Sequence, residues 1–63
     1  MSNLKAGDRV QVCGGKWPDA TITSVSKTYG YGRYIFAIEL DSPLEGATKY
    51  LMSECDLELI IIH

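Results

Sequence analysis

The sequence predicts an all-β protein, folded as a small antiparallel barrel of five strands. Short runs of alternating apolar and polar residues, which repeat every second position, follow one another through the 63 residues. Clusters of Gly, Pro, Asp and Ser separate these runs, as turns do between strands. No run shows the periodicity of an amphipathic helix. Strands so short and so closely spaced are typical of a small barrel.

The first strand is predicted over residues 7–12. Gly7 and Asp8 form a turn, and Val10 and Val12 then alternate with polar residues and face the core. A loop follows over residues 13–19, because paired glycines permit positive φ and Pro18 lacks the N–H that a central strand requires.

The second strand is predicted over residues 21–29, which are rich in β-branched side chains. Ile22 and Val25 lie three positions apart, so strict alternation would place them on opposite faces of the sheet. We expect a bulge or a sharp bend near Ser24 that turns both side chains inward.

The third strand, residues 33–40, has the clearest alternation and is followed by a loop over residues 41–46. The residues expected in the core are Phe36, Ile38 and Leu40. Ile35 then points outward, which indicates a covered apolar surface.

The end of the chain predicts strands over residues 48–52 and 57–62, joined by a single 3-10 turn over residues 53–56. Residues 1–5 are interpreted as an N-terminal arm. Residues 6–62 then form a single barrel domain, since the chain is too short for a second one.

The net charge of −2 argues against a general binder of polyanions. Residues 1–34 carry five cations and two anions, a net charge of +3, whereas residues 35–63 carry one cation and six anions, a net charge of −5. Either the surface is dipolar, or the interleaved strands of a barrel mix these charges.

Two cysteines and one histidine give no plausible metal-ligand set, and no cofactor is expected. Cys13 and Cys55 are expected to be free thiols in a reducing cytoplasm, with a disulfide as the alternative. The N-terminus shows no secretory signal, and the apolar run at residues 59–62 is too short to span a bilayer. We therefore expect a cytoplasmic protein that does not associate with membranes.

The opening Gly7-Asp8-Arg9-Val10-Gln11-Val12, followed by Gly15-Lys16-Trp17, resembles the start of SH3-like small barrels, including KOW domains. The ending Leu57-Glu58-Leu59-Ile60 after a one-turn helix is similar to how these barrels finish. The resemblance covers residues 6–60 and implies an SH3-like barrel with a KOW-like nucleic-acid-binding function. KOW segments, however, place glycines where this chain has Asp19 and, just beyond, near Ile22.

The same opening, Trp17 and the Leu57-Glu58 ending also resemble the plasmid-borne type II dihydrofolate reductases. Those enzymes are tetramers of small barrels that bind folate and NADPH in a shared pore. Their Val-Gln-Ile-Tyr segment falls on Lys49-Tyr50-Leu51-Met52, where none of the four residues matches. The resemblance therefore implies a related fold rather than a reductase.

An aromatic loop surface is the first candidate binding site, because Trp, Tyr and Arg are enriched in binding hot spots. Its residues are Lys16, Trp17, Tyr29, Tyr31, Arg33 and Tyr34. Alternatively, Trp17 and Tyr34 plug the ends of the barrel while the other two tyrosines decorate an exposed hairpin.

An apolar interface is the second candidate, formed by strand residues that alternate with the predicted core. Its residues are Ile35, Leu51, Ile61 and Ile62. Exposed together, they suit a dimer or a protein partner; the alternative is that an irregular barrel buries them.

No catalytic residues are identified. His63 is the last residue and is not expected to be held in place for acid–base work, and Cys55 is flanked by carboxylates rather than by the cations that favour a reactive thiolate. The sequence therefore favours a small non-enzymatic interaction module that self-associates, binds a protein partner through the aromatic loops, or does both. It resembles accessory or mobile-element proteins. The alternatives are a KOW-like nucleic-acid-binding module and an oligomeric pore enzyme similar to the type II reductases.

Overall fold

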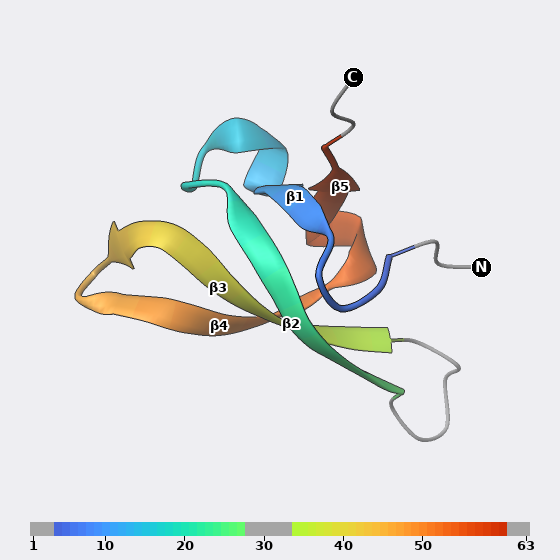
Figure 1. The fold of residues 1–63 in the computed structure, drawn as a ribbon. Coiled ribbons are helices and arrows are strands. Elements are labelled where there is room, and N and C mark those ends of the chain that lie inside the picture. The colour runs from blue at the N-terminus through green and yellow to red at the C-terminus, as the bar shows by residue number, and fades with distance from the viewer. Residues whose placement is uncertain (1–3, 28–33, 61–63) are drawn as a thin grey trace.

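The chain forms one strongly twisted β-sheet (Figure 1). The structure is a computed structural model that describes residues 4–27 and 34–60. No α-helix occurs within these residues. The elements are β1 (Arg9–Val12), η1 (Cys13–Gly15), β2 (Ala20–Lys27), β3 (Tyr34–Leu44), β4 (Ala47–Ser53), η2 (Glu54–Asp56) and β5 (Leu57–Leu59), where η1 and η2 are 3-10 turns.

The sheet has the strand order β4-β3-β2-β1-β5, and every neighbouring pair is antiparallel. The predicted all-β class, the five antiparallel strands and the 3-10 turn before the last strand are confirmed. The barrel is not closed, because β4 and β5 are the two edges and no ladder joins them in the described residues. β5 is only three residues long and pairs over its whole length with β1.

The inner face of the sheet carries the core, and its alternation is as predicted for β1 and β3. The buried apolar residues are Val10, Val12, Ala20, Ile22, Phe36, Ile38, Leu40 and Leu57. Leu4 packs against this cluster from the N-terminal side. A core of this size is small, since a chain of about 60 residues buries only about 60% of its unfolded surface.

A β-bulge interrupts β2 between Ile22 and Ser24, as the spacing of its apolar residues predicts. The Thr23 hydroxyl donates a hydrogen bond of 3.1 Å to the Ala37 carbonyl at this point. Ile22 is fully buried, but Val25 remains 36% exposed even though it lies opposite Phe36. The bulge therefore turns the Val25 side chain toward the inner face of the sheet, but the core does not cover it completely.

The turn after β1 is a second 3-10 element, η1, where the sequence predicts only a loop. Cys13, Gly14 and Gly15 all have positive φ, at 51°, 66° and 92°. The paired glycines make this left-handed path accessible, as expected from the sequence.

Strand β3 is longer than predicted and runs on to Leu44 through the segment expected to be a loop. Pro43 is tolerated there because pairing with β4 is irregular between Glu39 and Leu44. The hairpin closes with the two-residue turn Glu45-Gly46, in which both residues have positive φ, at 51° and 81°.

Strand β5 ends at Leu59, earlier than predicted, although the Ile60 N–H still donates to the Arg9 carbonyl at 2.9 Å. Ile61 and Ile62 of the predicted interface lie outside the described residues. Within the described residues, no helix has the length and hydropathy needed to cross a membrane.

Candidate interaction surface

The outer face of the β2–β3–β4 sheet brings two predicted interface residues together. Ala37 on β3 lies opposite Leu51 on β4, and Ile35 lies opposite Ser53. Leu51 is therefore a diagonal neighbour of Ile35, at a typical Cα separation of about 7–8 Å. We define the outer patch as Ile35, Ala37 and Leu51.

The outer patch is apolar and open to solvent. Leu51 is 72% exposed, more than any other large apolar side chain of the described residues, while Ile35 and Ala37 are half-buried. A shallow depression of about 210 Å³ lies over the Ala37 and Leu51 part of the patch. Its lining residues are Thr23, Ala37, Ile38, Lys49, Tyr50 and Leu51. Because Ala37 is small, the depression can accept an apolar side chain from another molecule.

The free edge of the sheet lies directly beside the patch. The Ala37 carbonyl accepts a bond from Thr23 on β2, so the backbone of Ala37 faces β2. Leu51 lies opposite Ala37, and the two therefore form a non-hydrogen-bonded pair of the β3–β4 ladder. The N–H and C=O of Leu51 consequently point away from β3, along the edge where no described strand pairs with β4.

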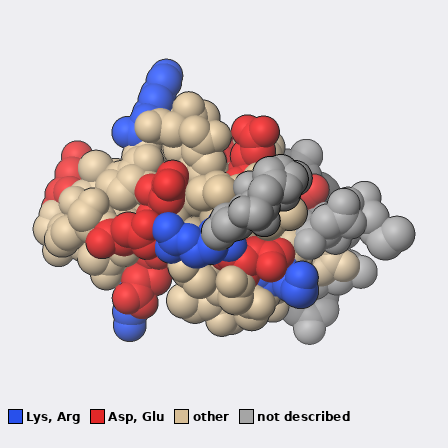
Figure 2. Space-filling view, turned by 45° about the horizontal axis from the view of Figure 1, so that its top comes forward, with Lys and Arg blue, Asp and Glu red and all other residues tan. Residues whose placement is uncertain are grey.

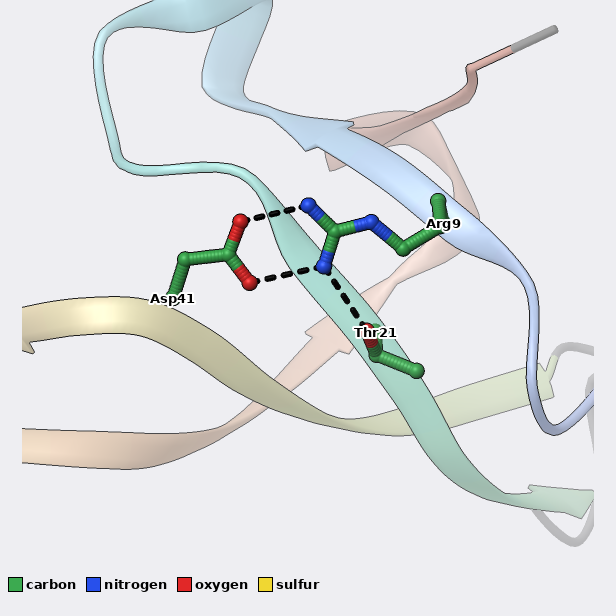
Figure 3. Close-up of polar contacts among 3 residues, drawn as sticks. All are labelled: Arg9, Thr21 and Asp41. Atoms are coloured by element: carbon green, nitrogen blue, oxygen red, sulfur yellow. Dashed lines mark hydrogen bonds and ion pairs between the residues drawn. The ribbon is translucent and has the colours of Figure 1, made fainter. Parts of the chain in front are cut away.

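A charged zone borders the patch on the same face. Glu39 on β3 lies opposite Lys49 on β4, and beyond them Arg9 on β1 binds Asp41 on β3 across β2 (Figure 3). The guanidinium donates to the two Asp41 oxygens at 2.7 Å and 2.5 Å and to the Thr21 hydroxyl at 2.9 Å. A bidentate pair of this kind fixes geometry as well as charge.

The two partners shift each other's pKa. The hydrogen bond to Asp41 raises the pKa of the Arg9 guanidinium, and the same bond lowers the pKa of the Asp41 carboxyl. Both shifts follow from the ion pair, which ties β1 to β3 over the middle strand. We therefore interpret Arg9, Thr21 and Asp41 as a clasp that holds the outer face rather than as a reactive site.

In the described part of the aromatic loop surface, Trp17 and Tyr34 pack against different aromatic rings. Trp17 packs edge-on against Tyr50, with ring centroids 5.0 Å apart, just before β2 begins. Tyr34 lies opposite Lys27, the last residue of β2, and packs against Phe36 at 6.4 Å. Trp17 thus contacts a residue opposite Ile38 of β3, whereas Tyr34 is the first residue of that strand.

Trp17 and Tyr34 are half-buried and pack against the core. Lys16 beside Trp17 is exposed. Tyr29, Tyr31 and Arg33 lie outside the described residues, so partner binding by this loop surface stays a prediction.

Charges of both signs are interspersed on the face drawn in Figure 2, where acidic side chains separate the basic ones. The described residues of that face do not form a continuous basic groove, which is what a nucleic-acid-binding surface requires. This arrangement corresponds to the mixed alternative rather than to a dipolar surface.

Both cysteines are free thiols; Cys13 is half-buried and Cys55 is exposed. The Cys55 thiol lies 3.0 Å from the Ser53 hydroxyl, which donates to Asp56 at 3.3 Å within the η2 turn. Over residues 4–27 and 34–60, three or more His, Cys, Asp or Glu side chains do not come together as a metal would require.

Comparison of the chain with protein-family models, with curated proteins and with solved structures finds no match. The outer patch and the sheet edge beside it are therefore interpreted from their own geometry.

Proposed function

We propose that this protein is a small non-enzymatic interaction module that binds a second copy of itself through the outer patch. The observation that carries the proposal is Leu51, which is 72% exposed and lies between an apolar depression and a free strand edge. Sequence reasoning identified Ile35 and Leu51 from the period of two alone, and both lie on this face.

A second copy suits the patch for two physical reasons. A chain of 63 residues has a small core, and association is a usual route by which small domains gain stability. The patch also lacks charge at its centre, because the acidic and basic side chains of this face lie beyond it at Glu39, Lys49 and the clasp. Two copies can therefore approach without placing like charges opposite each other.

The proposal is tested by size-exclusion chromatography with light scattering at high micromolar concentration. The wild type is expected to exceed the monomer mass of 7.0 kDa, and Leu51→Glu is expected to return it to that mass. Leu59→Glu is the control at the opposite edge, on β5; because Leu59 is 42% exposed but lies opposite the buried Val10, the fold of this variant is first compared with that of the wild type by circular dichroism. A monomeric wild type, or equal masses for Leu51→Glu and wild type, contradicts the proposal.

A further inference from the structure

The geometry points to a specific mode of self-association, in which β4 pairs antiparallel with β4 of a second copy about a two-fold axis through Leu51. The inference rests on the proposed function and names the arrangement of its partner. The resulting dimer has one sheet that continues through both chains, with β4 no longer at an edge.

The backbone of β4 supplies the first argument. The N–H and C=O of Leu51 point away from β3, toward the free edge of the sheet. Because these groups alternate in direction along a strand, those of Lys49 and Ser53, two positions away on either side, point toward the same edge. These backbone groups can form hydrogen bonds only with N–H and C=O groups of the second copy that also point toward its free β4 edge. The two-fold axis must therefore pair Lys49, Leu51 and Ser53 of one copy with residues of the same set in the other.

Side-chain chemistry then selects one register among the possible ones. An axis through Lys49 places like charges directly opposite each other, which is destabilising. An axis through Tyr50 places the Lys49 ammonium opposite Leu51. An axis through Leu51 instead places the two leucines side by side, and each is flanked by Ala37 of its own chain, so the apolar row is continuous across the dimer.

Charge complementarity supports the same register. With Leu51 on the axis, Lys49 lies opposite Ser53 of the second copy, and Glu54 follows directly as the first residue of η2. Lys49 and Glu54 are both exposed. The cationic beginning of each β4 thus lies beside the acidic end of the other, and the contact occurs twice because the interface is isologous.

The mode also explains the side chain at the edge. A lysine on an edge strand discourages unspecific pairing, because most registers bury or oppose its charge. In the register through Leu51, the ammonium of Lys49 stays at the rim, next to a carboxylate. Pairing over so short a strand buries little area, so the dimer is expected at high protein concentration.

Disulfide trapping tests the register. Leu51→Cys and Lys49→Cys are each placed in a Cys13→Ser, Cys55→Ser background whose fold and mass are first compared with those of the wild type. Leu51→Cys is expected to form a disulfide-linked dimer under mild oxidation, since directly opposite residues have Cα atoms about 5.5 Å apart. Lys49→Cys should not, because its two copies are four positions out of register, about 13 Å apart.

A proline variant tests the edge without changing the native cysteines. Lys49→Pro removes an outward N–H that the β3–β4 ladder does not use, so the monomer should keep its fold. We expect dimer affinity to fall by at least about tenfold, whereas the matched Lys49→Ala variant keeps the N–H and weakens the dimer less.

The outcomes separate this inference from the proposed function. A disulfide in Leu51→Cys together with a monomeric Lys49→Pro supports edge pairing. Three results would overturn this mode and leave self-association intact. They are a disulfide-linked Lys49→Cys dimer, a disulfide that forms only in a mixture of the two cysteine variants, and a Lys49→Pro variant that is as dimeric as the wild type. A monomeric wild type overturns both.

Discussion

The two faces of the sheet predict opposite costs for the same chemical change, Leu→Ala, at Leu40 and at Leu51. Leu40 is 3% exposed on the inner face, and Leu51 is 72% exposed on the outer face. Full burial of a leucine stabilises a protein by about 1.5–3 kcal/mol, so the 28% of Leu51 that is covered contributes about 0.4–0.8 kcal/mol. Leu51→Ala should therefore cost less than about 1 kcal/mol. Leu40→Ala should cost about 2–5 kcal/mol, because it also leaves a cavity.

The assay is urea unfolding, followed by circular dichroism at a protein concentration where the chain is monomeric. With an m-value near 1 kcal/mol/M, as expected for a domain of this size, Leu51→Ala should shift the midpoint by less than about 1 M. Leu40→Ala should shift it by at least about 2 M, or leave too little stability to measure, since a chain of this length has roughly 3–9 kcal/mol in total. If the two variants lose equal stability, Leu51 is not on the outer face and the patch does not exist.

Three further predictions concern the contacts that support this face. Asp41→Asn should lower stability at pH 7, because the lowered pKa of Asp41 means that its ionised form stabilises the fold above the ordinary pKa of an aspartate. This contribution is lost as the pH falls through the lowered pKa, so urea titrations at several pH values should show the difference between wild type and variant shrinking as the pH falls. Glu45→Asn should raise the free energy of unfolding by up to about 1 kcal/mol, because φ is +51° at this turn position and Asn adopts that conformation more readily than Glu. An unchanged or lower free energy of unfolding would exclude the turn geometry. Tyr50→Phe should cost about 0.5–1.5 kcal/mol in the same assay, because it removes the 2.5 Å bond that the Tyr50 hydroxyl donates to the Leu44 carbonyl and keeps the ring against Trp17.

Local pattern predicted the strands and their faces well. The period of two in β3 was sufficient to place Phe36, Ile38 and Leu40 inside and Ile35 outside, and the three-residue spacing of Ile22 and Val25 predicted the bulge. These features depend on side-chain direction along one strand, which sequence spacing determines directly.

Long-range features of the fold could not be predicted in the same way. Arg9 and Asp41 are 32 residues apart, and only the order of the strands in the sheet brings them together. The open sheet likewise depends on the strand order, which leaves β4 and β5 as its two edges in the described residues. Pro43 indicated a loop because proline has no N–H to donate, and its cost in a strand depends on whether a neighbouring strand needs a donor at that position, which local pattern does not specify.

The candidate site shows the same division. The outer-face position of Ile35 and Leu51 was predictable from alternation, but their position beside a free edge required the strand order. Trp17 and Tyr34 both belong to glycine-bordered segments, yet they pack against different rings, Tyr50 and Phe36.

The central claim is that β4 provides both the apolar side chain and the free backbone for self-association. A dilution series of amide chemical shifts and amide hydrogen exchange, recorded by NMR on the unmodified chain, tests it most directly. The account predicts concentration-dependent shifts centred on Lys49, Leu51 and Ser53, with the outward amides of these residues gaining protection as the concentration rises. Shifts centred instead on β5 or on the segment around Trp17, or spectra that do not change with concentration, would contradict it.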